Sequence, residues 1–180
     1  MDALQLKQPV LVGHSIAGEE LSSIGSRYPN KVAGLIYLDA GYPYAYYDSS
    51  RGNLLLDAAD LQRKLDLFMA GGGQDPKRLV QELQAILPHF ETELQEDEKQ
   101  LTDTPAPIPP AIPWAIMTEG EKYTSIHVPV LAIFADPHAP GPMVKNDPAA
   151  RAAAVARDLA STTAQAKAFQ TGIPSAHVVY

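Results

Sequence analysis

The sequence predicts an α/β protein built around a parallel sheet. A short apolar run at Pro9–Val12 is followed by a turn at Ser15, a helical pattern and a second apolar run at Lys31–Leu38. Strand, helix and strand in this order form the unit from which parallel sheets are built. A third apolar run, Val128–Ala135, adds a further strand. With 180 residues, 46% of them hydrophobic, the chain can bury one sizeable core.

The helix between the first two strands is predicted by the spacing of its apolar residues. Ala17, Leu21, Ile24 and Tyr28 follow one another at intervals of four, three and four residues. This spacing places them on one face of a helix. The helix should end near Pro29–Asn30, since proline cannot continue it.

The middle of the chain, residues 42–125, has a different character. It contains 14 acidic and 7 basic side chains, so the formal charge of −7 arises there, and we expect a solvated polar lobe. Two helical patterns, from Leu54 to Phe68 and from Leu79 to Leu94, are separated by three glycines. Pro88 should bend or divide the second helix. Five prolines between Pro105 and Pro113 predict an extended, stiff linker.

The last part of the chain returns to the α/β pattern. Asp147 and Pro148 form an N-cap followed by a proline at the first helical position. An alanine-rich helix should follow, reach about Phe169 and end near Gly172. The final letters, "SAHVVY", predict the beginning of one more strand.

Composition excludes several classes of function. The negative net charge argues against nucleic acid as a partner, and the absence of cysteine excludes disulfides and thiolate sites. No apolar run is long enough to span a membrane, and the five histidines lack the spacing of metal ligands, so we expect no metal and no cofactor. Without a signal peptide, a cytoplasmic location is expected.

Ser15 carries the strongest chemical signal. The letters "GHSIA" match the G-x-S-x-G turn of a nucleophilic serine, with Ala17 in place of the second glycine and Gly18 directly after it. Small residues are needed there because the chain crosses itself closely. The backbone N–H of Ile16 would help to hold an oxyanion at the start of the helix. The alternatives are an ordinary serine N-cap and a phosphate-binding turn, but the turn lacks the G-x-G-x-x-G pattern.

On these residues the chain resembles the α/β-hydrolase superfamily, in its serine-type, capped, esterase- or lipase-like form. "PVLVGHSIAG" resembles the fifth strand and nucleophile elbow of that family, "KVAGLIYLDAGYP" the sixth strand, and "VPVLAIFADPHAPGP" the seventh strand with its acid-bearing loop. The resemblance implies a partial α/β-hydrolase fold, in which a parallel sheet has helices on both faces and a helical cap inserted.

The resemblance also implies the organisation of the chain. Residues 1–41 would be core, residues 42–125 the cap or lid, and residues 126–180 core again, forming a single domain with a cap overall. The strands that come first in the family would precede Met1, together with the second oxyanion donor. We therefore expect a chain truncated at both ends, and secretion stays open as an alternative location.

Two residues compete for the acid of a Ser-His-Asp triad. Asp136 directly follows the seventh strand, where most members of the family carry the acid, but the usual position lies slightly deeper, at His138 and Ala139. Asp39 follows the sixth strand, which a minority of members use. Asp39 would otherwise accept hydrogen bonds from the start of the cap. We favour Asp136 and keep Asp39 as the alternative.

The resemblance places the triad histidine several residues beyond Tyr180. His177 would then be a strand residue, and His138 lies close to Asp136 in sequence, so each is only a minor alternative for the base. His14 flanks the nucleophile and should pack or hydrogen-bond under the turn. Two further histidines, His89 and His127, are interpreted as surface residues.

The resulting hypothesis is a serine hydrolase that acts on carboxylic ester, thioester or amide bonds of a small molecule. Four tyrosines would line an acyl pocket or simply pack: Tyr42, Tyr44, Tyr46 and Tyr47. Without the histidine, this chain alone should be inactive or nearly so. The alternative is a catalytically inactive fragment or pseudo-hydrolase that serves as a binding module. The sequence leaves the substrate and the oligomeric state open.

Overall fold

The protein forms two compact units. The structure, a computed structural model, describes residues 2–71, 73, 75–98, 115–116, 121–136, 138 and 147–180. One unit combines Met1–Tyr46 with Tyr123–Tyr180 and contains the sheet, and the other is the helical segment Tyr47–Lys122. The proline-rich linker expected at residues 105–113 lies outside the described residues.

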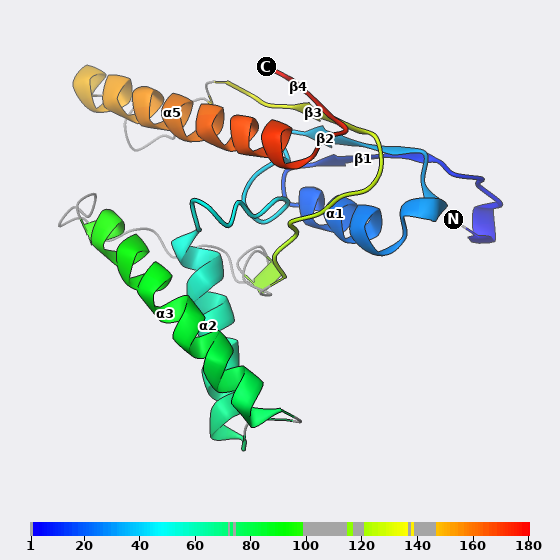
Figure 1. Cartoon of the computed structure of the whole chain (residues 1–180). Helices are drawn as coiled ribbons and strands as arrows, with labels where there is room; N and C mark the ends of the chain where they lie inside the picture. Colours follow the sequence, from blue (N-terminus) through cyan, green and yellow to red (C-terminus); the bar gives the residue numbers. More distant parts are fainter. Residues whose placement is uncertain are drawn as a thin grey trace. The chain divides into compact units, whose positions relative to one another are not determined.

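Four parallel strands form one sheet in the order β1-β2-β3-β4 (Figure 1). They are β1 (Val10–His14), β2 (Gly34–Leu38), β3 (Val130–Ile133) and β4 (Ala176–Val179). The predicted α/β class with a parallel sheet is confirmed, as are the order of the first three strands and the strand at the end of the chain. The second strand begins later than predicted, because Pro29–Lys31 forms a 3-10 turn, η2.

Helices α1 (Ala17–Arg27) and α5 (Pro148–Gly172) pack on the same face of the sheet. Tyr37 of β2 shows this arrangement. Its hydroxyl lies 3.0 Å from Ser22 Oγ of α1, and its ring meets the edge of Phe169 of α5 with a centroid distance of 5.1 Å. Because one side chain points to one face, both helices lie there. Tyr37 and Phe169 are completely buried and form the centre of the core.

The opposite face of the sheet carries an apolar row. Val12 pairs in register with Ile36, and Ile36 pairs with Leu131. Val12 is 57% exposed and Ile133 is 37% exposed. Within the described part of this unit, no α-helix covers that face. The sequence predicted helices on both faces of the sheet, but the two α-helices that the structure describes in this unit lie on the same face.

The caps of α5 lie where the sequence predicts them. The Asp147 carboxylate accepts two backbone hydrogen bonds from the first turn, and the helix ends at Gly172. From the middle of the helix, the Gln165 amide donates to the carbonyls of Gly41 and Tyr46 at 3.2 and 3.1 Å. These bonds fix the loop after β2 onto the helix.

The second unit is built from α2 (Leu54–Met69) and α3 (Pro76–Glu98), which pack against each other. Asn53 caps α2 by accepting a hydrogen bond from the Leu56 amide at 3.2 Å. Contrary to one predicted outcome, Pro88 does not divide α3, which is a single helix. A proline removes one hydrogen bond, and packing against α2 keeps the helix intact despite that loss.

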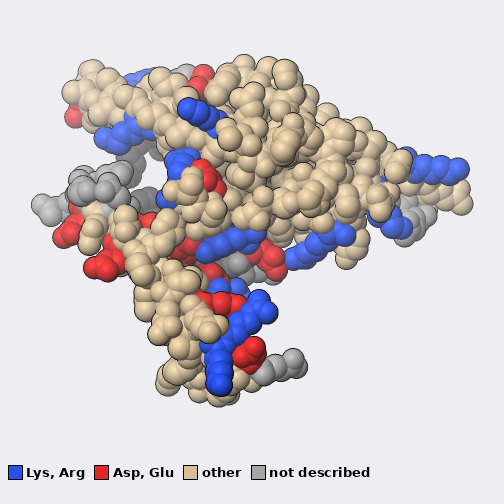
Figure 2. All heavy atoms as spheres, viewed as in Figure 1, with Lys and Arg blue, Asp and Glu red and all other residues tan. Residues whose placement is uncertain are grey.

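Charged side chains of both signs gather along one edge and the upper end of the α2–α3 unit, whereas a broad area over the strands shows no charge in this view (Figure 2). Three acidic residues of the helical unit are buried, namely Asp57, Asp60 and Glu93. The prediction of a solvated polar lobe is wrong for these residues, because two of them are paired with lysines. None of the helices that the structure describes is long and apolar enough to cross a membrane.

Candidate active site

Ser15 lies in the turn between β1 and α1, as the sequence predicts. Its φ is +54°, in the left-handed region that residues with a side chain rarely adopt. Its backbone N–H donates to the Leu38 carbonyl of β2 at 3.2 Å. The hydrogen-bond ladder of the sheet therefore holds Ser15 at the carboxyl end of β1, where ligands of open parallel sheets bind.

Small residues let the chain cross itself at this turn. A β-carbon added to Gly13 would lie 3.1 Å from the Ala17 β-carbon, and one added to Gly18 would lie 2.0 Å from the Ala40 carbonyl oxygen. Any side chain at position 18 would therefore push α1 away from the chain that follows β2. The pattern of small residues in the sequence has this steric origin.

The amide of Ile16 is a free donor at the start of α1. Ile16 is the N-cap residue, with φ −56° and ψ −23°. Among the described residues, no group accepts a hydrogen bond from its N–H. A helix N-terminus with an unused amide can stabilise a negative oxygen.

Asp39 occupies the equivalent position on the neighbouring strand. The register pairs His14 with Leu38, so Ser15 and Asp39 follow aligned residues of β1 and β2. Asp39 also has a positive φ, +48°, and its N–H donates to the Ile133 carbonyl at 2.7 Å. The two candidate residues thus leave adjacent strands at the same edge of the sheet.

The carboxylate of Asp39 has three donors around it. The Tyr42 hydroxyl donates to Oδ1 at 2.6 Å, the Ala135 amide lies 3.2 Å from Oδ1, and His138 Nε2 lies 3.0 Å from Oδ2. Partial burial raises the pKa of Asp39, but these hydrogen bonds outweigh it and lower the pKa below its ordinary value. Asp39 is therefore an ionised carboxylate that binds an imidazole. The hydrogen bond from Tyr42 also agrees with the structural alternative for Asp39, a carboxylate that accepts hydrogen bonds from the segment after β2.

His138 lies between two carboxylates. Its Nε2 contacts Asp39, and its Nδ1 lies 3.1 Å from Asp158 Oδ1, on α5. Burial lowers the pKa of His138, but the hydrogen bonds and negative charges of Asp158 and Asp39 outweigh it, so the pKa is raised. The raised pKa favours the doubly protonated ring, and the Tyr42 hydroxyl also lies 2.8 Å from Nε2. A doubly protonated ring has no lone pair with which to accept the proton of Ser15.

The predicted tyrosines divide into two groups. The Tyr42 hydroxyl donates to Asp39, and Tyr44 lies near Ser15. Burial raises the pKa of Tyr44, and the Ser15 hydroxyl lowers it by a smaller amount. Tyr46 instead packs in the core, with its ring 5.8 Å from that of Phe169. The acyl pocket itself stays a prediction.

Asp136, the acid favoured from the sequence, makes fewer contacts. Its Oδ1 is buried and accepts no hydrogen bond from the described residues. His138, two residues further on, contacts Asp39 instead. The structure therefore brings an imidazole to the alternative acid, while the role of each aspartate stays a prediction.

Sequence reasoning missed Asp158 completely. Its carboxylate accepts from the His138 backbone amide at 2.8 Å as well as from the ring. No spacing signal could have found it, because 20 residues separate the two and the contact depends on how α5 packs. His177 belongs to β4, as expected. His14 ends β1 and is exposed, so the expectation that it packs under the turn is wrong.

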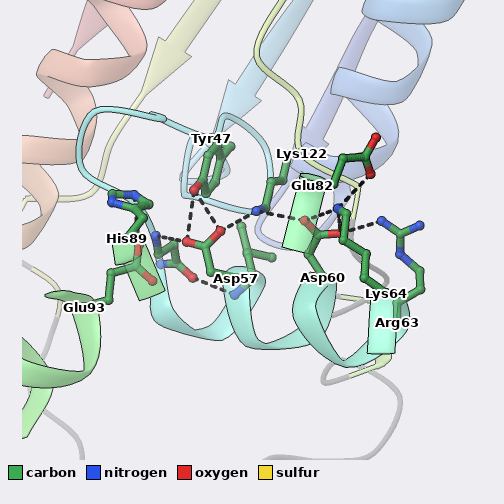
Figure 3. A network of polar contacts seen from close by, with 11 residues as sticks. Tyr47, Asp57, Asp60, Arg63, Lys64, Glu82, His89, Glu93 and Lys122 are labelled. Atoms are coloured by element: carbon green, nitrogen blue, oxygen red, sulfur yellow. Dashed lines mark hydrogen bonds and ion pairs between the residues drawn. The ribbon is translucent and has the colours of Figure 1, made fainter. Parts of the chain in front are cut away.

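The helical unit holds a second polar cluster (Figure 3). Asp57 accepts hydrogen bonds from the Tyr47 hydroxyl at 2.8 Å and from Lys122, and Asp60 pairs with Lys64 at 2.6 Å. The sequence predicted no metal site. Within the described residues, however, Asp57, His89 and Glu93 lie close enough together to hold a cation.

Comparison with known proteins finds a partial similarity to a hydrolase. A curated protein named pyrethroid hydrolase, from Sphingobium wenxiniae, is 31% identical over 109 residues, which is 45% of this chain and 39% of that protein. The chain therefore spans well under half the length of this relative. No protein-family model and no solved structure matches the chain. The chain has a parallel α/β sheet and is similar, over part of its length, to a hydrolase.

Proposed function

We propose that this chain carries the nucleophile and the acid of a serine hydrolase that cleaves a carboxylic ester, thioester or amide bond of a small molecule. The observation that carries the proposal is that Ser15 and Asp39 occupy equivalent positions at the ends of two neighbouring strands. They follow aligned residues at the ends of adjacent parallel strands, both with positive φ, and the Asp39 carboxylate binds an imidazole. The similarity to a hydrolase supports the same reaction type.

In the proposed reaction, the Ser15 hydroxyl oxygen forms a bond to the substrate carbonyl carbon. A histidine takes the hydroxyl proton and later gives it to the leaving alcohol, thiol or amine, and water then hydrolyses the acyl-serine. The Ile16 amide stabilises the negative oxygen of the tetrahedral intermediate. Asp39 orients the histidine, a role for which Asp136 is the alternative.

The base is the part that limits this chain. The two ring nitrogens of His138 lie against the carboxylates of Asp39 and Asp158, so the ring must leave one of these carboxylates before it can act as the base. A histidine held in this way is not available as a base, so we expect the 180-residue chain to be a poor catalyst, because enzymes without one triad member retain only about 10³- to 10⁴-fold acceleration over water.

The paired state of His138 also favours a second candidate, a catalytically inactive binding module with this fold. Under the first proposal, residues 42–125 act as the cap, and residues 1–41 and 126–180 act as the core. Under the second, Ser15 is a structural residue of the turn. The reactivity of Ser15 separates the two.

The test uses a fluorophosphonate probe and a short-chain p-nitrophenyl ester on the 180-residue chain and its variants. We expect slow labelling of Ser15 and slow ester hydrolysis, both abolished by Ser15→Ala. Asp39→Asn should reduce both far more than Asp136→Asn does, whereas Glu82→Gln, an exposed control, should change neither. No labelling of the wild-type chain would reject the hydrolase proposal, and the reverse order of the two aspartates would return the acid to Asp136.

A further inference from the structure

The helical unit contains a group of three side chains with the geometry of metal ligands. Asp57 comes from α2, and His89 and Glu93 lie one helical turn apart on α3 (Figure 3). One ligand atom from each residue lies within 4.8 Å of the other two. Donors around a single divalent ion at about 2.0–2.2 Å from each lie at separations within this range.

The atoms that face this space lack hydrogen-bond partners. His89 Nε2 and both carboxylate oxygens of Glu93 are buried, and no hydrogen bond of good geometry reaches them from the described residues, although the Asp57 carboxylate and the Asn53 amide lie close to Glu93. His89 Nε2 and Glu93 Oε1 lie 3.4 Å apart without forming a hydrogen bond. The Glu93 side chain is only 8% exposed. Buried polar groups are normally satisfied, so these atoms indicate a missing partner.

Of the two carboxylates in this cluster, Asp57 has a cation beside it, but Glu93 has no lysine or arginine of its own among the described residues. Lys122 pairs with Asp57 and lies 3.3 Å from Asp60, which also pairs with Lys64. No described lysine or arginine forms an ion pair with Glu93. Two aspartates therefore share two lysines, whereas the Glu93 carboxylate has His89 and the negatively charged Asp57 beside it.

The backbone leaves room for the group. Gly52 has a φ of +70°, and a β-carbon added there would lie 1.5 Å from Glu93 Oε1 and 2.7 Å from His89 Nε2. The loop before α2 thus passes directly against both candidate ligand atoms. Only a glycine fits at this position, for reasons of both space and backbone angle.

We propose that Asp57, His89 and Glu93 bind a divalent transition-metal ion of the zinc class. One imidazole nitrogen with two carboxylate oxygens suits zinc, manganese or cobalt better than calcium or magnesium, which prefer oxygen alone. The ion ties α2 to α3 and satisfies both Glu93 and His89. Asp57 already accepts from Tyr47 and the Asn53 amide, so it offers the ion a remaining lone pair while Lys122 moves onto Asp60.

The test measures binding of zinc to the metal-free 180-residue chain by equilibrium dialysis and calorimetry, with cobalt absorption as a report on the ligand set. We expect one zinc per chain, weakened at least about tenfold in Glu93→Gln and in His89→Gln. Glu82→Gln, on the same helix, and the His127→Gln/His177→Gln pair are the controls and should bind like the wild type. Zinc should also raise the melting temperature of the wild type but not that of the ligand variants.

The His89 side chain is 41% exposed, so the His89→Gln variant should fold even if the Glu93→Gln variant does not. Circular dichroism of the metal-free variants verifies folding. The proposal is overturned if the wild type binds no zinc, or if the His89 and Glu93 variants bind zinc as well as the wild type does. In that case the buried Glu93 carboxyl is protonated and binds no ion. The readout is binding, so it does not depend on hydrolase activity.

Discussion

The two units of this protein each contain an imidazole beside two carboxylates, but the surroundings of these groups differ. In the sheet unit, both ring nitrogens of His138 meet carboxylate oxygens of Asp39 and Asp158. In the helical unit, His89 Nε2 and the Glu93 carboxylate are buried, and no hydrogen bond of good geometry reaches them from the described residues. The first cluster is saturated within the chain, and the second is not.

The comparison shows that neighbouring donors, not the residue types, decide what such a cluster can do. Asp39 receives bonds from Tyr42, the Ala135 amide and His138, and its pKa falls despite burial. Burial, together with the negative charge of Asp57, raises the pKa of Glu93 to about 8. The same chemical group is thus a stable anion in one unit and is ready to take a proton or a cation in the other.

The largest predicted effect comes from removing the cation of the helical cluster. Lys122→Met leaves two buried carboxylates, Asp57 and Asp60, without their shared partner, since their side chains are 3% and 7% exposed. We expect a loss of about 3 kcal/mol in the free energy of unfolding, measured by urea denaturation. Arg63→Met is the matched control, because the Arg63 side chain is 61% exposed and its pair with Asp60 should contribute little. Equal losses in both variants would show that Lys122 does not hold the cluster together.

A smaller, pH-dependent effect should distinguish the sheet cluster. The pKa of His138 is raised by Asp158 and Asp39, so its ion pairs are fully present below about pH 6.5 and are lost as the pH rises through the folded-state pKa. The lowered pKa of Asp39 keeps that carboxylate charged until the solution is strongly acidic. His138→Gln should therefore destabilise the chain by about 1 kcal/mol more at pH 5.5 than at pH 9, after allowing for partial solvent exposure.

The measurement is denaturation at the two pH values, with His127→Gln as control. Among the described residues, His127 contacts the Ser125 hydroxyl and no carboxylate. The interpretation of His138 as an imidazolium fails if its substitution costs the same at both pH values.

The smallest predicted change concerns only the titration of His138. Asp158→Asn removes one of the two carboxylates, so the pKa of His138 should move down toward its ordinary value. An NMR titration of the ring protons measures this change. Asp147→Asn alters a carboxylate at the start of the same helix and should leave the titration as it was. If His138 is a weak base for Ser15, Asp158→Asn should also raise ester hydrolysis, and an unaltered rate argues for a histidine outside this chain.

Local patterns predicted much of the fold. The strand, turn and helix around Ser15 follow from apolar spacing and small residues, and the Asp147 cap follows from its place before a proline. Pro88 shows the limit of such rules, since α3 stays a single helix where packing against α2 compensates for the lost bond. The candidate site was predicted in part, because Ser15 and Asp39 were both named but the contacts of Asp39 were not.

The sequence by itself therefore determined the α/β class, the positions of most strands and helices, and the turn that presents Ser15. Only the tertiary structure decided that His138 lies on Asp39, 99 residues away, and on Asp158, and that His89 and Glu93 meet Asp57. The physical reason is the range of the interactions. Helix periods, caps and tight turns depend on residues a few positions apart, whereas side-chain clusters depend on strand register and helix packing, which join distant segments.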